Sequence, residues 1–574
     1  MPTGDCLAQA ESLAVPALRG KGRGSADLFA LTEAVANAPQ VPLPMNPPLP
    51  ATRSGKSGAW LDCLMEATAY PHPVRQIRRL ETHISHVFLT GHFAYKIKKA
   101  VDLGFLDFSS LARRRFYCQE ELRLNRRLAP DLYLAVVPIA DTENGCLIGG
   151  PAPAVEYTVK MLEFPQSALL DAMLTRGAVT AAQIDALADR VARFHGDIPR
   201  AGSGDDYGTA NTVWTGFSGA VAHLRAQLGG PGDAAALAQL SVIENWARRE
   251  YGRRQSLLTE RKSSGFVREC HGDLHLGNIA WWPDEPQIFD GIEFSPNLRW
   301  IDTISEIAFT SMDLAAHGRP DLAWRFLNRY LEGSGDYDGL QILPFYEVYR
   351  AIVRAMVARI RAAQQNNGGE AATEAARYLA HAEQATKPRR RLLILMHGLS
   401  GAGKTTVAEA ALESIGAIRI RADVERKRLA GLPATARGDC GVEGGIYSAD
   451  STRATYNHLV QLARRIVDAG FPVVVDAASL QGWQRAIFRS QALAQGVPFR
   501  LLSCRADEAV LFERVQARAQ AGGDASDAGP AVLRHQLQNS EPLSPAEERE
   551  CLVVDGREAS LAAVLHQLVE EAAQ

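Results

Sequence analysis

Long apolar runs are missing from this sequence. Among its 574 residues, no stretch approaches the roughly 18 consecutive apolar residues that a membrane-spanning helix needs. The N-terminus also lacks the charged start followed by an apolar core that marks a secreted chain. These absences predict a cytoplasmic protein that has no membrane partner.

Paired cysteines are missing as well. The eight cysteines are scattered and none belongs to a C-x-x-C pair, which argues against zinc sites and against a framework of disulfide bonds. We expect them to be buried thiols in a reducing cytosol.

An excess of one charge is the third absence. The chain has 62 Lys and Arg against 65 Asp and Glu, a formal net charge of −3, so no global basic field indicates binding to nucleic acid. A local basic groove stays open as an alternative. With 46% hydrophobic and 22% charged residues, the composition is typical of a globular enzyme.

The length of the chain suggests roughly three to four domain-sized units. Residues 1–58 are rich in Ala, Pro, Gly and Ser, as in VPLPMNPPLP, and predict a disordered leader. We divide the rest into a first half at 59–385, a basic linker at 386–391 and a second half at 392–574.

The stretch at 270–294, CHGDLHLGNIAWWPDEPQIFDGIEF, carries the polar residues around which the first half is organised. Asp273 lies five positions before Asn278, the interval at which kinases place the Asp that orients the attacking hydroxyl and the Asn that holds a metal ion. Two apolar residues then lead to Asp290, as in a short strand that ends in a second metal-binding carboxylate. The pattern predicts ATP and magnesium. The alternative is a turn with solvated polar residues.

HGDLHLGN followed by FDGIEF resembles the catalytic core of the aminoglycoside phosphotransferase and choline kinase group. The resemblance implies a two-lobed kinase fold, with a small lobe at about 70–162 and a large lobe at about 163–385. It also implies that Asp273 is the catalytic base and that Asn278 and Asp290 bind magnesium. His275 stands where many protein kinases carry a phosphate-contacting lysine, and a solvated histidine is the alternative.

Two lysines are candidates for the residue that pairs with the nucleotide phosphates. The strand-like runs at 84–89 and 93–98, joined by a Thr-Gly turn, predict a hairpin that places Lys96 and Lys98 on one face. We favour Lys96 because it sits deeper in its strand. The amphipathic helix expected at 112–128 offers the acid partner that the kinase mechanism requires. We favour Glu121 for this role, with Glu120 or a merely solvated helix as alternatives.

The glycine-rich loop of protein kinases does not precede these lysines. The turn at 82–85 would have to cover the phosphates instead. A further strand at 155–161, broken by LEFP, predicts an interlobe hinge that presents backbone groups to adenine.

The large lobe is predicted to be helical, with helices at 180–196 and 212–262. We interpret His195 as a packed or capping histidine. Asp302 and Glu306 are four apart on one helical face, where they brace the catalytic loop or line an acidic site for a substrate amine.

The second half opens with the most specific motif of the sequence. The apolar strand at 392–396 runs into GLSGAGKT at 398–405, which matches G-x-x-x-x-G-K-[ST] between a strand and a helix. In this loop the backbone wraps a phosphate, Lys404 reaches the outer phosphates and Thr405 coordinates magnesium. The predicted nucleotide ligands are Gly398, Ser400, Gly401, Ala402, Gly403, Lys404, Thr405 and Thr406.

Strands and helices alternate downstream of this loop, which predicts a parallel sheet with helices on both faces. The expected helices are at 452–469, 483–495 and from 507, and the expected strands are at 472–477 and 498–504. Asp476 ends an apolar strand, as a metal-binding Walker-B acid does.

IRADVERKRL at 420–429 resembles the acceptor loop of 5′-end polynucleotide kinases, gluconate kinases and related small kinases. The resemblance implies that Asp423 activates the acceptor hydroxyl and that Arg426 contacts phosphate or substrate. Arg514 and Arg518 resemble the lid arginines of that group, with solvated helix arginines as the alternative. The Gly-rich stretch at 521–530 would connect the lid.

The chain beyond the leader resembles a group of bacterial two-domain proteins that fuse an aminoglycoside-phosphotransferase-like domain to an ATP-binding P-loop domain. We therefore expect an α/β protein with an α+β first half: a two-lobed protein-kinase-like domain followed by a P-loop nucleotide-kinase-like domain. The hypothesis is a bifunctional ATP-dependent phosphotransferase in which each half phosphorylates a hydroxyl of a small molecule.

Three alternatives stay open. The missing glycine-rich loop favours a regulatory ATP-binding protein in which one half is a pseudokinase. The second half could instead phosphorylate nucleic-acid 5′ ends, and the first half could confer antibiotic resistance through an acidic acceptor pocket. The sequence predicts neither the acceptors nor the oligomeric state.

Overall fold

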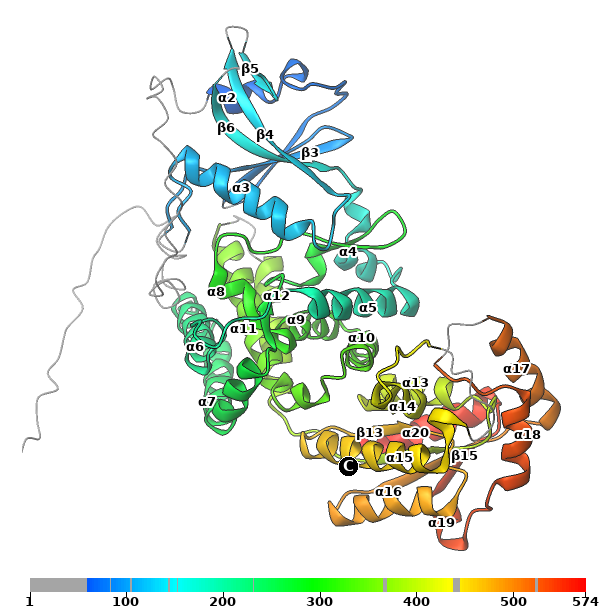
Figure 1. The fold of residues 1–574 in the computed structure, drawn as a ribbon. Coiled ribbons are helices and arrows are strands. Elements are labelled where there is room, and N and C mark those ends of the chain that lie inside the picture. The colour runs from blue at the N-terminus through cyan, green and yellow to red at the C-terminus, as the bar shows by residue number, and fades with distance from the viewer. Residues whose placement is uncertain are drawn as a thin grey trace, which may run out of the picture.

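The computed structural model describes residues 59–573, apart from residues 83, 104–105, 143–144, 152, 231, 365–368, 437–443 and 522–524. The predicted leader at 1–58 lies outside these described residues. Figure 1 shows a sheet-containing lobe at the top, a bundle of helices below it, and a second sheet wrapped by helices at the lower right. None of the described helices combines the length and apolarity needed to cross a bilayer.

The small lobe is built on a six-stranded antiparallel sheet with the order β1-β2-β3-β6-β4-β5. Its elements are α2 (Ala59–Cys63), η2 (Ala67–Ala69), β1 (Arg78–Glu81), β2 (Ser85–Leu89), β3 (Phe93–Lys98), α3 (Leu111–Asn125), β4 (Tyr133–Thr142), β5 (Gly145–Ile148) and β6 (Ala154–Leu162). The predicted hairpin is confirmed as β2 and β3, which pair antiparallel around Gly91 at φ 88°. The predicted charged helix is α3, which begins at its cap Ser110 and packs on β6 and β4.

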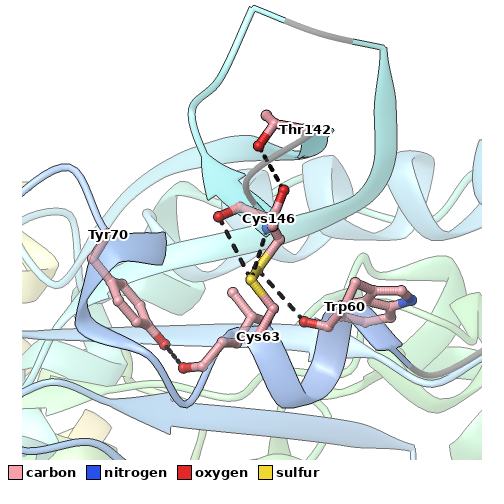
Figure 2. The surroundings of a disulfide bond; sticks show 7 residues. Trp60, Cys63, Tyr70, Thr142 and Cys146 are labelled. Atoms are coloured by element: carbon pink, nitrogen blue, oxygen red, sulfur yellow. Dashed lines mark hydrogen bonds between the residues drawn. A yellow bond between two sulfur atoms is a disulfide. The ribbon is translucent and has the colours of Figure 1, made fainter.

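The structure contradicts the expectation of buried thiols at two of the cysteines, which form a disulfide. Figure 2 shows Cys63 of α2 bonded to Cys146 of β5. The Cα atoms of the two residues are 5.9 Å apart. The bond lies in a small apolar core with Leu64 and Tyr70. Spacing could not reveal it, because the two cysteines are 83 residues apart and only the folded sheet brings β5 beside α2. The expectation of buried thiols holds for Cys118, Cys270 and Cys504.

The large lobe is mainly helical. Its helices are η3 (Gln166–Ala168), α4 (Leu170–Thr175), α5 (Ala181–Asp197), α6 (Ala210–Gln227), α7 (Ala234–Ser263), η4 (Leu276–Asn278), α8 (Pro296–Arg299), α9 (Thr303–Ala316), α10 (Pro320–Ser334), η5 (Tyr337–Gln341), α11 (Leu343–Gln364) and α12 (Gly369–Ala385). Two antiparallel pairs of strands, β7 (Val267–Glu269) with β10 (Trp300–Asp302) and β8 (Ile279–Trp281) with β9 (Pro286–Ile288), frame the predicted catalytic loop. Helix α9 is almost entirely buried and packs against α10, α11 and α12. The loop therefore rests on the core of the lobe.

The second half contains the predicted parallel sheet, with the order β12-β13-β11-β14-β15. Its strands are β11 (Leu393–His397), β12 (Ile418–Arg421), β13 (Val473–Asp476), β14 (Phe499–Cys504) and β15 (Cys551–Val554). Its helices are α13 (Lys404–Ile415), α14 (Ala422–Leu429), η6 (Gly445–Tyr447), α15 (Ala449–Asp468), α16 (Gly482–Ala494), α17 (Glu508–Ala521), α18 (Pro530–Asn539), α19 (Pro545–Arg549) and α20 (Glu558–Ala573).

Both faces of this sheet are covered. Leu393 and Leu395 belong to one apolar cluster, whereas Ile394 and Met396 belong to another. Alternate residues of one strand point to opposite faces of a sheet, so each face has its own core. A strand that is buried on both faces has a continuous apolar sequence. The strands of this sheet could therefore be predicted from the sequence.

Candidate active sites

The predicted catalytic loop of the first half is held by a buried carboxylate. Glu306 of α9 accepts hydrogen bonds from the backbone amides of His271 (3.1 Å) and Gly272 (2.6 Å). Its third partner is His195, whose Nε2 lies 2.9 Å from Glu306 Oε2. Gly272 has φ 92°, and an added Cβ would lie 2.8 Å from the carbonyl oxygen of Leu298. Glycine and Glu306 together therefore set the path of the chain just before Asp273.

Asp273 and Asn278 lie together, as their spacing predicts. The Asn278 side-chain amide donates to the Asp273 carboxylate (3.1 Å) and to its carbonyl oxygen (3.0 Å). His275 Nε2 lies 3.4 Å from the same carboxylate. Burial opposes the ionised form of Asp273, but the charge of His275 and its hydrogen bond outweigh burial and hold the pKa of Asp273 below its usual value. An ionised Asp273 suits an acceptor for the hydrogen of a substrate hydroxyl.

Asp290 is held in a backbone conformation that is rare for a residue with a side chain, at φ 62°. Its amide donates to the hydroxyl of Tyr133 at 3.1 Å, and the next amide, of Gly291, donates to Asn125 Oδ1 at 2.8 Å. Strained backbone of this kind clusters at functional sites. The carboxylate of Asp290 is 47% exposed and forms an ion pair with Lys96.

Lys96 and Glu121 meet as predicted, within a larger network. Lys96 Nζ lies 2.9 Å from one oxygen of Glu121, and Lys98 Nζ lies 2.7 Å from the other. Lys98, although it is the last residue of its strand, is only 1% exposed and also pairs with Glu293. Burial raises the pKa of Glu121, but the two ammonium groups outweigh burial and lower the pKa to about 2. The contact to both Glu121 and Asp290 distinguishes Lys96 from Lys98.

Some neighbouring residues are placed outside this cluster. Glu120, the alternative partner, pairs with Arg123 on the surface at 2.8 Å. Asp302 binds Arg261 at 2.7 Å and caps α9, so it does not share a site with Glu306. Glu293 was missed by sequence analysis, and the signal that could have found it is its position three residues after Asp290.

In the second half, the glycine-rich loop has the conformation that a phosphate-binding loop needs. Gly398, Gly401 and Gly403 have φ values of 138°, 86° and 89°. An added Cβ would lie 2.4 Å from the carbonyl oxygen of Cys504 at Gly398, and 2.8 Å from that of Leu511 at Gly401. Gly403 caps α13. The amides at the start of this helix form a natural site for a phosphate.

The predicted magnesium ligands of this half lie side by side. Thr405 Oγ1 donates to Asp476 Oδ2 at 3.0 Å, because the parallel strands β11 and β13 end at the same edge of the sheet. A hydroxyl and a carboxylate are suitable oxygen ligands for magnesium. Burial lowers the pKa of Lys404, and the carboxylates of Asp476 and Asp423 oppose that effect.

The remaining predicted residues surround this loop at different positions. Arg514 Nη1 lies 3.3 Å from the carbonyl oxygen of Gly401, whereas Arg518 binds the carbonyl of Ala528 in the α17–α18 connection at 3.1 Å. Asp423 lies in the first turn of α14. Arg426 donates to the carbonyl of Ile446 (2.9 Å) and to Thr452 (3.1 Å), so it contacts η6 and the first turn of α15.

Gln536 is a neighbour of the phosphate-binding loop that sequence analysis missed. Its Oε1 accepts a hydrogen bond from the amide of Ser400 at 2.9 Å. It comes from α18, more than a hundred residues further along the chain, and no motif marks it. Thr406 follows Thr405 in the first turn of α13, and Ala402 is buried.

Residues 393–543 match the family model described as AAA domain. Solved structures similar to parts of the chain include a sugar kinase from Janibacter (22% identity, 32% of this chain and 92% of that chain, TM-score 0.22). They also include the APS kinase of Mycobacterium tuberculosis in complex with AMPPNP and APS (20% identity, 32% of this chain and 99% of that chain, TM-score 0.24). A third is the ethanolamine kinase of Plasmodium vivax (12% identity, 54% of this chain and 81% of that chain, TM-score 0.33).

Two curated relatives span both halves. The chain is 32% identical over 481 residues to the uncharacterized proteins Rv2004c of Mycobacterium tuberculosis and Mb2027c of Mycobacterium bovis, a match that covers 82% of this chain and 92% of each relative. The chain therefore belongs to the family of these mycobacterial proteins, and its second half is a P-loop domain.

Proposed function

We propose that the chain is an ATP-dependent phosphotransferase with two centres, each of which transfers the γ-phosphoryl group of ATP to a hydroxyl of a small molecule. The observation that carries the proposal is the meeting of Lys96, Glu121 and Asp290 in the half that also pairs Asp273 with Asn278. Phosphoryl transfer in protein kinases uses the same parts: a strand lysine, a helix acid, a metal-binding Asp and an Asp–Asn pair in the catalytic loop.

In the first centre, Lys96 binds the nucleotide phosphates and Glu121 holds the lysine in position. Asn278 and Asp290 are the magnesium ligands, and the metal neutralises charge on the phosphates when it is bound. Asp273 accepts the hydrogen of the acceptor hydroxyl. The hydroxyl oxygen forms a bond to the γ-phosphorus as the bond to the β–γ bridging oxygen breaks, and ADP leaves.

In the second centre, the amides of residues 398–406 and Lys404 bind the phosphates, while Thr405 and Asp476 hold magnesium. Asp423 is the base for the acceptor hydroxyl. Arg514, which lies against the phosphate-binding loop, and Arg518 stabilise charge on the transferred group. Arg426 contacts the acceptor. Kinases with a P-loop act in this way on many acceptors, so the fold does not identify the substrate.

A regulatory role for the first half is the second candidate. The observation that favours it is the short connection between β1 and β2, which spans residues 82–84 and leaves no room for the glycine-rich loop that covers the phosphates in protein kinases. Retention of the Asp273–Asn278 pair favours catalysis instead, because nucleotide binding alone does not require a base.

The test is transfer of label from γ-labelled ATP to a panel of hydroxyl metabolites and short oligonucleotides. Asp273→Asn and Lys404→Ala are compared with Asp284→Asn, an exposed acid in the β8–β9 turn, and with Lys387→Ala, an exposed linker lysine. We expect Asp273→Asn and Lys404→Ala each to abolish transfer to a different acceptor, with the two controls unchanged. If Asp273→Asn leaves every transfer intact, the first half is not a kinase and the regulatory role replaces this proposal.

A further inference from the structure

Helix α10 belongs to the first half but contacts the sheet of the second. It packs on α13 and on β12, the strand at one edge of the five-stranded sheet. Asn328 of α10 donates to the carbonyl of Ala417 (2.9 Å) and accepts from the amide of Arg419 (2.6 Å). An edge strand has unpaired backbone groups, and α10 satisfies some of them. The helix is therefore fixed in register against β12.

Glu332, one turn further along α10, lies between two arginines of β12. One carboxylate oxygen lies 3.1 Å from Arg421 Nη1, and the other lies 3.1 Å from Arg419 Nη2. Glu332 is 8% exposed and Arg419 is 6% exposed, so water screens these pairs little. Arg329 also approaches Glu332, at 3.5 Å. A residue of the first half thus binds one end of the Arg421 guanidinium.

Arg421 reaches the predicted magnesium site of the P-loop half. Its Nε lies 3.8 Å from Asp476 Oδ2, the same oxygen that accepts the hydrogen bond of Thr405. A guanidinium that pairs fully with a metal-binding carboxylate competes with the metal for that oxygen. Nη1 of Arg421 is bound to Glu332, while Nε stays 3.8 Å from Asp476. Glu332 therefore holds one end of the guanidinium, and Arg421 does not form a close pair with Asp476.

We propose that Glu332 is a positioning residue of the P-loop site: it holds Arg421 back from Asp476, so that the site reaches its full magnesium affinity only with α10 docked. This inference rests on the proposed function of the P-loop half. Residues that orient metal ligands from outside the coordination sphere typically change metal affinity by about 10- to 100-fold. We expect the lower end of that range, because Glu332 acts through one intervening side chain.

The substitution Glu332→Gln separates this role from simple packing. Glutamine keeps the size of the side chain but not its charge, so Arg421 turns toward Asp476 and more magnesium is needed for nucleotide binding. Arg421→Ala has the opposite effect, because it removes the competitor. In the Arg421→Ala background, Glu332→Gln has no further effect if the acid acts through that arginine.

The measurement is a magnesium titration of mant-ATP binding to the full chain, followed by fluorescence. The signal that Lys404→Ala removes is assigned to the P-loop site, since the first half contributes the rest. Asp338→Asn is the matched control. Asp338 also joins the two halves, through Arg465 at 2.9 Å, but both side chains are half-exposed and their ion pair does not involve Asp476.

We expect Glu332→Gln to raise the magnesium midpoint of the Lys404-dependent signal about tenfold, with Asp338→Asn unchanged and the Arg421→Ala double variant equal to Arg421→Ala alone. A Glu332→Gln midpoint equal to wild type, or an additive effect in the double variant, overturns the inference while leaving the proposed function intact. If Lys404→Ala removes no signal, the proposed function of this half fails and the inference with it. If the Glu332→Gln variant does not fold, the Arg421→Ala variant provides the test. A magnesium midpoint that does not fall in Arg421→Ala contradicts competition between Arg421 and magnesium for Asp476.

Discussion

Replacing Glu306 by Gln should lower the unfolding free energy of the first half by an amount that depends on pH. Burial raises the pKa of this carboxyl, but its bonds to His195 and to the loop amides outweigh burial and lower the pKa from 4.5 to about 2. At about 1.4 kcal/mol for each pKa unit, this lowering stabilises the fold by about 3 kcal/mol at neutral pH. Glutamine resembles the protonated acid, so Glu306→Gln should remove that amount.

The sign of the pH dependence follows from the lowered pKa. The stabilisation is complete above pH 4.5, the usual pKa of the group, and is lost as the pH falls toward the folded pKa. By this linkage the difference between wild type and Glu306→Gln at pH 3 should shrink to roughly half of its value at pH 7. Transfer by the first half should also fall about 100-fold at neutral pH, since the loop that carries Asp273 loses its support.

Urea unfolding of both proteins at pH 7, 5, 4 and 3 measures this difference. Glu120→Gln is the control, because the Glu120–Arg123 pair lies on the surface and such pairs are worth about 0–1 kcal/mol. A difference between wild type and Glu306→Gln that is below about 1 kcal/mol at pH 7, or that stays constant with pH, would refute the assignment of Glu306 as an ionised brace.

Three further predictions concern other contacts. Lys96→Met should lower transfer by the first half at least about 100-fold, with a smaller loss of stability than Lys98→Met, because the buried Glu121 keeps its bond to Lys98. Lys98→Met leaves the buried Glu293 without its cation and should cost about 3–5 kcal/mol of unfolding free energy. Equal effects of the two substitutions on activity and on urea unfolding would contradict their separate roles. Gln536→Ala frees the Ser400 amide and should tighten ATP binding at the P-loop about fivefold, the equivalent of one hydrogen bond, and unchanged affinity in a binding titration would contradict this. Cys63→Ser, or reduction of the wild type, opens a loop of 83 residues and should lower the unfolding free energy of the small lobe by about 4 kcal/mol; a Cys63→Ser protein that is still sensitive to reductant would show that the effect lies elsewhere.

Local chemistry explains what the sequence could predict. The phosphate-binding loop was readable because each glycine, the lysine and the threonine stand in one short segment between a strand and a helix. The same holds for Asp273 and Asn278, which share one loop. The strand–helix alternation of the second half was readable because strands buried on both faces are continuously apolar.

Contacts between distant segments explain what the sequence could not predict. Gln536 and Glu332 carry no motif of their own, and each gains its place only when a helix from elsewhere in the chain packs beside a site. The Cys63–Cys146 bond is of the same kind, since it depends on how β5 pairs with β4. The choice between Lys96 and Lys98 also depended on the fold, because both face Glu121 and only Lys96 reaches Asp290.

The central claim, that both halves transfer phosphoryl groups, is tested most directly by magnesium-dependent ATP turnover with a mixture of acceptors. The proteins to compare are wild type, Asp273→Asn, Lys404→Ala and the variant that carries both substitutions. The account predicts that each single variant keeps part of the turnover and that the double variant has none. Complete loss of turnover in Lys404→Ala, together with unchanged turnover in Asp273→Asn, would contradict it.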